Sequence, residues 1–202
     1  MRRLGFPVIH TREPGGTELG ESIRKLLLDP AHRNVCPKTE FLLYEAVRAQ
    51  HTTEKIRKNL RLGKVVVCER YSDASMAYQG FGRGLPQRSL ETIDKFATDG
   101  LTPDLTILFD LPVEVGLRKA ISAKKEFSKK GDRMERAGLA FHRKVRQGYL
   151  ALAKRHSRIR VVAVRPGSTP DSTFEKVRNI LGIIVRKAPC KGRPNAARRT
   201  KR

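Results

Sequence analysis

The chain has 202 residues, of which 39% are hydrophobic, so it can form one globular domain with a core, and disorder over most of its length is excluded. Its formal net charge of +23 favours a polyanionic partner, such as nucleic acid, an anionic membrane or phosphorylated small molecules. No apolar run approaches the roughly 18 residues that span a bilayer, and the basic start precedes no apolar signal segment, so we expect a cytoplasmic protein without a membrane anchor.

The hydrophobic pattern alternates between strand-like and helix-like segments. In chain order it predicts a strand at 7–10, helices at 17–29 and 39–60, a strand at 64–68, a helix at 86–96, a strand at 104–111, helices at 113–123 and 134–155, a strand at 158–164 and a helix at 169–185. This alternation is typical of an α/β fold with three layers, in which helices cover both faces of a mainly parallel sheet. Ligands of such folds bind outside the carboxyl ends of the strands.

A polar segment directly follows the apolar strand at 64–68. Glu69 and Arg70 begin this segment, which therefore emerges where a phosphate would lie in an open α/β sheet. Arg12 and Arg48 come from two other segments, and a guanidinium group can donate two parallel hydrogen bonds to phosphate. A surface turn remains an alternative for the polar segment, and chance remains one for the three arginines because the chain has 43 basic residues.

Tyr44 and Arg48 lie four residues apart on one predicted helix and so share a face. An aromatic ring beside a fixed hydrogen-bond donor can stack on and bond a nucleobase, and Tyr78 and Gln79 can supply further bonds to base and sugar. The alternative is that Tyr44 packs in the core while Arg48 is a surface charge.

The segment 124–131 has no apolar period and carries four lysines, so we predict a surface loop there. With Arg133 it can close over phosphates during transfer, or it can be a solvated face. Residues 186–202 contain eight Lys or Arg and no acidic residue, which predicts a disordered basic tail beyond a domain at 1–185. The tail can contact nucleic acid weakly and without specificity, or have no specific role.

Several motifs together resemble the bacterial thymidylate kinase family. They are T-R-E-P-G-G-T from Thr11, E-F-L-L-Y-E-A-V-R-A-Q-H from Glu40, E-R-Y-S-D-A-S-M-A-Y-Q-G from Glu69, D-L-P from Asp110, D-R-M-E from Asp132 and V-R-Q-G-Y-L from Val145. The resemblance covers roughly residues 1–180. It implies a P-loop NTPase-like fold, a homodimer, and transfer of a phosphoryl group from ATP to dTMP, with Mg²⁺, for dTTP biosynthesis.

The resemblance also implies roles for individual residues. Arg12 and Arg70 would hold the phosphate of dTMP, with Glu13 beside them, and Arg70 and Arg133 would act on the transferred group, Arg133 from the lid. The nucleoside would be recognised by residues of two helical segments, namely Tyr44 stacking on thymine, Arg48, Ser75 and Gln79 facing the base, and Tyr78 crowding the sugar. Glu69, where the family has aspartate, would stand toward Mg²⁺.

One motif of the family is missing from these residues. No G-x-x-x-x-G-K-[ST] sequence occurs in the chain, and Met1 to Phe6 resemble the end of the helix that follows that loop. We expect a late start assignment or a truncation, with the first strand and the phosphate loop absent and two strand edges left unpaired. Catalysis by the chain as given is therefore doubtful. The alternatives are a non-catalytic nucleotide- or nucleic-acid-binding protein derived from such a kinase, and a related kinase with another base preference.

Overall fold

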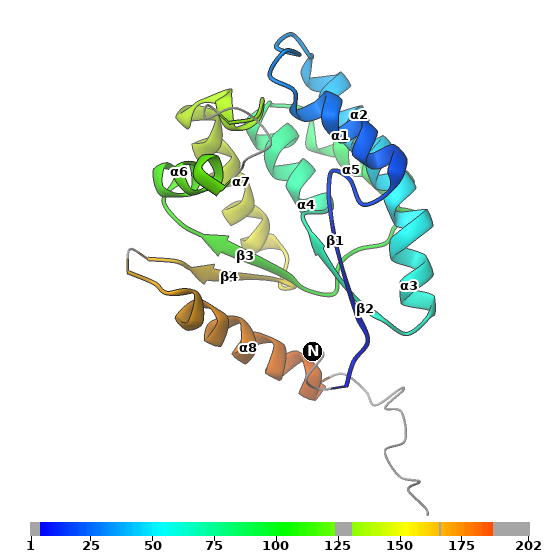
Figure 1. Ribbon diagram of the computed structural model, residues 1–202, viewed down its shortest axis with the longest axis vertical. Coiled ribbons are helices and arrows are strands. Elements are labelled where there is room, and N and C mark those ends of the chain that lie inside the picture. Colours follow the sequence, from blue (N-terminus) through cyan, green and yellow to red (C-terminus); the bar gives the residue numbers. More distant parts are fainter. Residues whose placement is uncertain (1–4, 124–130, 166, 188–202) are drawn as a thin grey trace, which may run out of the picture. The chain divides into compact units, whose positions relative to one another are not determined.

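The computed structural model describes residues 5–123, 131–165 and 167–187 (Figure 1). The chain divides into two compact units, residues 1–165 and 166–202, which we describe separately. The first unit contains all four strands. The described part of the second unit contains one long helix, α8 (Pro170–Lys187), which extends two residues beyond the predicted domain end at 185. The rest of the predicted basic tail and the lysine-rich segment 124–130 lie outside the described residues.

The strands form two separate parallel pairs. β1 (Val8–Arg12) pairs with β2 (Val65–Glu69), and β3 (Thr106–Asp110) pairs with β4 (Ile159–Ala163). Figure 1 shows each pair running side by side. Within the described residues β2 and β3 each have only this one partner. The parallel pairing agrees with the predicted fold class, and the division into two pairs is what the absence of a central strand from these residues predicts.

Helical segments follow each strand of the first unit except β4. They are α1 (Glu18–Leu28), α2 (Pro37–His51), η2 (Thr52–Ile56), α3 (Arg57–Arg61), α4 (Ser72–Ser75), η3 (Met76–Gly82), α5 (Gln87–Thr98), α6 (Val113–Ala123), η4 (Glu135–Ala137) and α7 (Leu139–Arg155). η2 and η3 are wide π-helical turns, and η4 is a 3₁₀ turn. None of the described helices is long and apolar enough to cross a membrane.

The observed helix ends agree with the sequence prediction at some positions and differ from it at others. Thr17 is the N-cap of α1, as predicted, since its hydroxyl accepts a hydrogen bond from the Gly20 amide at 3.1 Å. The helix predicted to begin at 134 begins instead at Leu139, because Gly138 has a φ of +85°, which is incompatible with a right-handed helix. The helix predicted at 39–60 is continuous but contains the wide turns of η2 in its middle.

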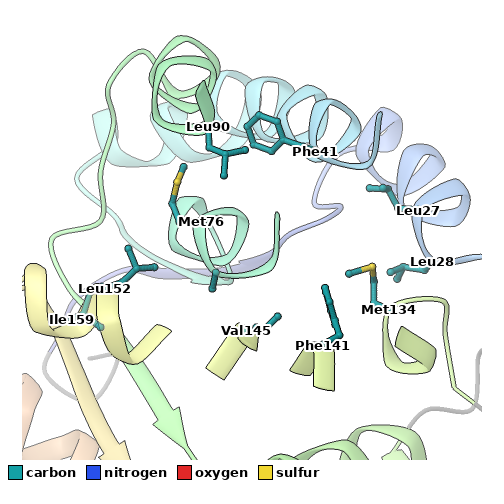
Figure 2. Close-up of a cluster of buried hydrophobic side chains, with 11 residues drawn as sticks. Leu27, Leu28, Phe41, Met76, Leu90, Met134, Phe141, Val145, Leu152 and Ile159 are labelled. Atoms are coloured by element: carbon teal, nitrogen blue, oxygen red, sulfur yellow. The ribbon is translucent and has the colours of Figure 1, made fainter. Parts of the chain in front are cut away.

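A single cluster of buried side chains forms the core of the first unit (Figure 2). Its members come from helices at both ends of the unit and from β4, and include Leu27, Leu28, Phe41, Met76, Leu90, Met134, Phe141, Val145, Leu152 and Ile159. A methyl group on Gly148 of α7 would lie 2.7 Å from Phe81, so glycine permits α7 to approach η3 closely. This packing fixes η3, which carries Tyr78 and Gln79, beside α7.

Candidate functional site

Arg70 follows β2 directly and has an unusual backbone conformation. Its φ is +66°, in the left-handed region that arginine adopts at a cost of roughly 1–3 kcal/mol. Its guanidinium carbon lies 4.8 Å from the centre of the Tyr78 ring. Chiefly Tyr78, and to a smaller extent the phenols of Tyr149 and Tyr44, raise the pKa of Arg70, so this side chain is a permanent cation. Such backbone strain is concentrated at functional sites. Here it accompanies a contact between the guanidinium group of Arg70 and the Tyr78 ring.

Aromatic side chains surround this cation. The Tyr78 ring makes edge contacts with Phe141, His142 and Tyr149 at centroid distances of 6.0, 6.5 and 6.3 Å. Burial raises the pKa of the Tyr44 phenol, which therefore stays neutral. Flat aromatic rings beside a guanidinium group suit a ligand that combines a planar base with a phosphate.

Arg48 is enclosed by carboxylates. It is 1% exposed, its Nε donates to Glu13 Oε2 at 3.0 Å, its Nη1 donates to Asp94 Oδ1 at 3.0 Å, and it pairs with Glu45 on the same helix. Burial alone would lower the pKa of Arg48, but the three carboxylates raise it overall. These carboxylates hold Nε and Nη1 of Arg48, so a base would meet Nη2 or would have to replace one of these partners.

Glu13 joins the loop after β1 to helix α2. Its Oε1 lies 2.9 Å from Nδ1 of His51, whose Nε2 lies 2.7 Å from the Thr11 hydroxyl. The Glu13 amide also donates to the Glu69 carbonyl oxygen at 2.9 Å, which continues the β1–β2 pairing. Glu13, predicted to assist the phosphate site, therefore positions the loop and Arg48.

Glu45 and Ser75 lie beside this network. Burial raises the pKa of Glu45 to about 7, and the neighbouring Asp94 adds to the effect, although Arg48 opposes it. The hydroxyl of Ser75, a residue that is 2% exposed, lies near Glu45 and acts to lower the pKa of that carboxyl. A proton can therefore be gained or lost near neutral pH one contact away from a residue predicted to face the base.

Glu40 is the acceptor in a second buried hydrogen-bond network, and the sequence analysis did not identify it as a site residue. Its carboxylate is fully buried. The Oε1 atom accepts hydrogen bonds from Gln79 Nε2 at 2.8 Å and from Arg83 Nε at 3.1 Å. The Oε2 atom accepts from Arg83 Nη2 at 2.9 Å and from Arg133 Nη1 at 2.6 Å. Burial raises the pKa of Glu40, but the hydrogen bonds from Arg83 and Gln79 outweigh it and lower the pKa overall. The carboxylate is therefore ionised. The sequence offered one signal, because an acidic residue stands directly beside the apolar run Phe41-Leu42-Leu43.

Arg133 contacts the end of α1 as well as Glu40. Its Nε donates to the Leu27 carbonyl oxygen at 2.7 Å, its amide donates to the Leu28 carbonyl oxygen at 3.0 Å, and the residue is 9% exposed. The structure therefore places this predicted lid arginine in a buried junction between α1, α2 and η4. Arg133 and Arg70 both act to lower the pKa of the Tyr44 phenol, so the two predicted catalytic arginines lie near Tyr44.

Arg12 and Glu69 are exposed at the carboxyl ends of β1 and β2. Arg12 Nη2 lies 3.0 Å from Glu21 Oε2, and Glu69 Oε1 lies 2.8 Å from His10 Nε2. The described residues contain no group of three or more potential metal ligands. Mg²⁺ that accompanies a nucleotide commonly takes one or two protein carboxylates and completes its shell with phosphates and water, so the single exposed Glu69 carboxylate fits this requirement.

Two further features lie at opposite ends of β3, the first at its amino end and the second at its carboxyl end. Asp73 accepts two hydrogen bonds from Arg158, at 2.6 and 2.7 Å, and one from Thr106 at 2.8 Å, which fastens α4 to the second strand pair. A cavity of about 310 Å³ is lined by residues of the β3–α6 connection and of α7, namely Pro112, Val113, Glu114, Arg143, Arg146 and Gln147. Both arginines of this cavity pair with carboxylates, so it differs from the aromatic site around Arg70.

The chain is similar in sequence and in fold to known proteins. Residues 1–169 match the family described as Thymidylate kinase. A thymidylate kinase from Carboxydothermus hydrogenoformans is 49% identical over 181 residues, which cover 90% of this chain and 85% of that protein. The crystal structure of thymidylate kinase from Ehrlichia chaffeensis matches with a TM-score of 0.65 and 28% identity, over 87% of this chain and 80% of that chain.

Proposed function

Because the chain belongs to the thymidylate kinase family, we propose that its site binds dTMP as acceptor and ATP as donor and carries out ATP + dTMP → ADP + dTDP, a step of dTTP biosynthesis. The observation that carries this proposal is Arg70, a permanent cation held by a strained backbone against Tyr78 at the carboxyl end of a parallel strand. This is where an α/β fold places a phosphate.

The described residues can bind each part of dTMP. Arg70, assisted by Arg12, hydrogen-bonds the phosphate. Tyr44 stacks on thymine, and Tyr78 packs closely against the sugar. The groups that face the base edge are then Arg48, Ser75 and Gln79. Arg48 joins them through Nη2 or by exchanging a partner at Nη1, where Asp94 and Glu45 already share one nitrogen.

The donor side relies on charge neutralisation. Phosphoryl transfer is catalysed mainly by positioning and by cations that offset the charge on the transferred group. Arg70 approaches that group from the acceptor side, and Arg133 supplies a second cation when it leaves its contact with Glu40. Mg²⁺, when bound, neutralises the phosphate oxygens of ATP, and Glu69 would hold it directly or through water.

The experiment that tests the proposal separates acceptor binding from turnover. The full 202-residue chain is titrated with dTMP by calorimetry, beside Arg70→Ala and the exposed control Arg88→Ala. We expect wild type and Arg88→Ala to bind dTMP equally, and Arg70→Ala to bind at least tenfold more weakly, since a charge-assisted contact to phosphate is worth roughly 1.5–3 kcal/mol.

Turnover is measured on the same chain and on a version preceded by a strand and a G-x-x-x-x-G-K-[ST] loop. Since the 202 residues contain no such loop, we expect dTMP-dependent ADP release from the extended version and little from the chain alone. Failure of wild type to bind dTMP would overturn the proposed function. Binding of dTMP without turnover by either version would favour the non-catalytic alternative.

A further inference from the structure

The side-chain amide of Gln79 has a defined orientation. Its Nε2 lies 2.8 Å from Glu40 Oε1, and the two residues are 1% and 0% exposed. Arg83 and Arg133 both donate to the same carboxylate, so Glu40 is ionised. An ionised carboxylate only accepts hydrogen bonds, and therefore the NH₂ group of Gln79 must face it.

This orientation leaves the Gln79 oxygen for another partner. Among the described residues the only side-chain hydrogen bond of Gln79 is the one that its nitrogen donates to Glu40. Water has little access to this nearly buried side chain. Among the described residues the fully buried side-chain atoms without a partner do not include this oxygen, so it keeps some contact with solvent and a ligand that brings an N–H group can reach it.

Gln79 lies next to the site proposed for dTMP. It neighbours Tyr78 in the wide helical turn η3, and Tyr78 contacts the guanidinium group of Arg70. Wide π-helical turns occur frequently at functional sites. The other groups proposed to face the base discriminate less in this structure, because the Ser75 hydroxyl can donate or accept and Arg48 is occupied by carboxylates.

We propose that Glu40 is a positioning residue that sets the base preference of the acceptor site, because it fixes Gln79 so that only an acceptor faces the base. Thymine and uracil carry a hydrogen on N3 and can donate to this oxygen. Cytosine has an unprotonated N3, which would oppose it. The inference rests on the proposed function and adds to it the residue that distinguishes these pyrimidine nucleotides.

The test compares the affinities of dTMP, dUMP and dCMP for the full chain and for Glu40→Gln. A neutral amide at position 40 can either donate or accept, so Gln79 can turn and offer its NH₂ group to cytosine. We expect the preference for dTMP over dCMP to fall at least tenfold, in part through tighter binding of dCMP, while dUMP follows dTMP. A general loss of structure would not strengthen the binding of dCMP.

Asp73→Asn is the matched control. It also removes a buried carboxylate that binds an arginine, but its partner is Arg158, and we expect the dTMP preference to be unchanged. An unchanged preference in Glu40→Gln, with dTMP still bound, would overturn the role of Glu40 alone. Failure of wild type to bind any of the three nucleotides would overturn the proposed function and, with it, this role.

A measurement on the wild-type protein keeps the inference testable if Glu40→Gln does not fold. With ¹³C,¹⁵N-labelled glutamine, the side-chain carbonyl carbon of Gln79 should shift on addition of dTMP, while its NH₂ signals move little because they remain bonded to Glu40. A shift confined to the NH₂ signals would mean that Gln79 donates to the base, and the inference would be wrong.

Discussion

At the scale of single residues, the most consequential feature is a buried cation shared by several carboxylates. Arg48 has Glu13, Glu45 and Asp94 as partners, so one positive charge opposes three acidic groups inside the protein. Burial and Asp94 together raise the pKa of Glu45 to about 7 from its usual 4.5. The network therefore holds a proton that an unfolded chain would release well below neutral pH.

This raised pKa makes stability depend on pH. Because the folded state holds the proton more tightly than the unfolded state, the stabilising contribution of Glu45 is complete below about pH 4.5 and is lost as the pH rises through about 7. Glu45→Gln removes this dependence. We expect the change in unfolding free energy between pH 5 and pH 8 to differ between wild type and variant by about 1–3 kcal/mol, with wild type losing more.

Urea unfolding at the two pH values measures this difference. Comparing the change with pH, instead of stability at one pH, cancels those effects of the substitution that do not depend on pH, such as altered packing. The assignment to Glu45 would be wrong if both proteins lost equal stability between pH 5 and pH 8.

Some residue contacts could be predicted from sequence, and others could not. The order of motifs identified Arg70 and Tyr78 as neighbours in one segment, and the structure brings them into direct contact. The enclosure of Arg48 by Asp94 and the meeting of Glu40 with Arg83 and Arg133 join distant segments that have no common period. Only the three-dimensional arrangement reveals which of many charged residues become partners.

At the scale of elements, the approach of α7 to η3 sets the position of the nucleoside-facing residues. Gly148→Ala would place a methyl group 2.7 Å from the Phe81 side chain. We expect a loss of about 1–3 kcal/mol of unfolding free energy, since an overfilled contact forces the two elements apart. Denaturant titration measures the loss, and the affinity for dTMP should fall with it because Tyr78 and Gln79 lie on η3.

Gly116→Ala in α6 is the control, because it adds the same methyl group to a helical glycine. Its methyl group would meet Leu111 at 3.5 Å, which is an ordinary contact. Since alanine favours a helix interior over glycine by roughly 0.5–1 kcal/mol, this variant should be as stable as wild type or more so. Equal effects of the two substitutions would contradict the packing argument.

Most elements were predictable, and the irregular ones were not. Periodicity located each strand and most helix ends, including the N-cap Thr17, because local residue types determine those features. It did not locate η2 and η3, because stretches of 5 and 7 residues are too short to show a period of their own. The late start of α7 had a visible cause in Gly138, but a glycine alone does not reveal its φ angle.

At the scale of the whole molecule, we propose a homodimer formed through α1 and α2. These two helices pack against each other, yet Leu19, Leu26 and Leu42 remain about half exposed. Covering such side chains with a second copy would be favourable by roughly 25 cal/mol per Å² of apolar surface. Leu42→Glu should therefore give a monomer in light scattering, whereas wild type should have twice the chain mass.

Leu62→Glu provides the comparison, because Leu62 is also exposed but caps α3. It should leave the dimer intact. A monomeric wild type at tens of micromolar, or a dimer disrupted by Leu62→Glu and not by Leu42→Glu, would contradict this interface.

The division into two strand pairs also bears on synthesis of the chain on the ribosome. The β1–β2 pair can close as soon as the residues through Glu69 have emerged, whereas the β3–β4 pair must wait for Ala163. Leu27 and Leu28 in α1 share the core with Met134 and Phe141, which emerge about a hundred residues later. An early half with paired strands but an uncovered apolar surface would therefore persist through much of translation, which makes the nascent chain a natural client for chaperones.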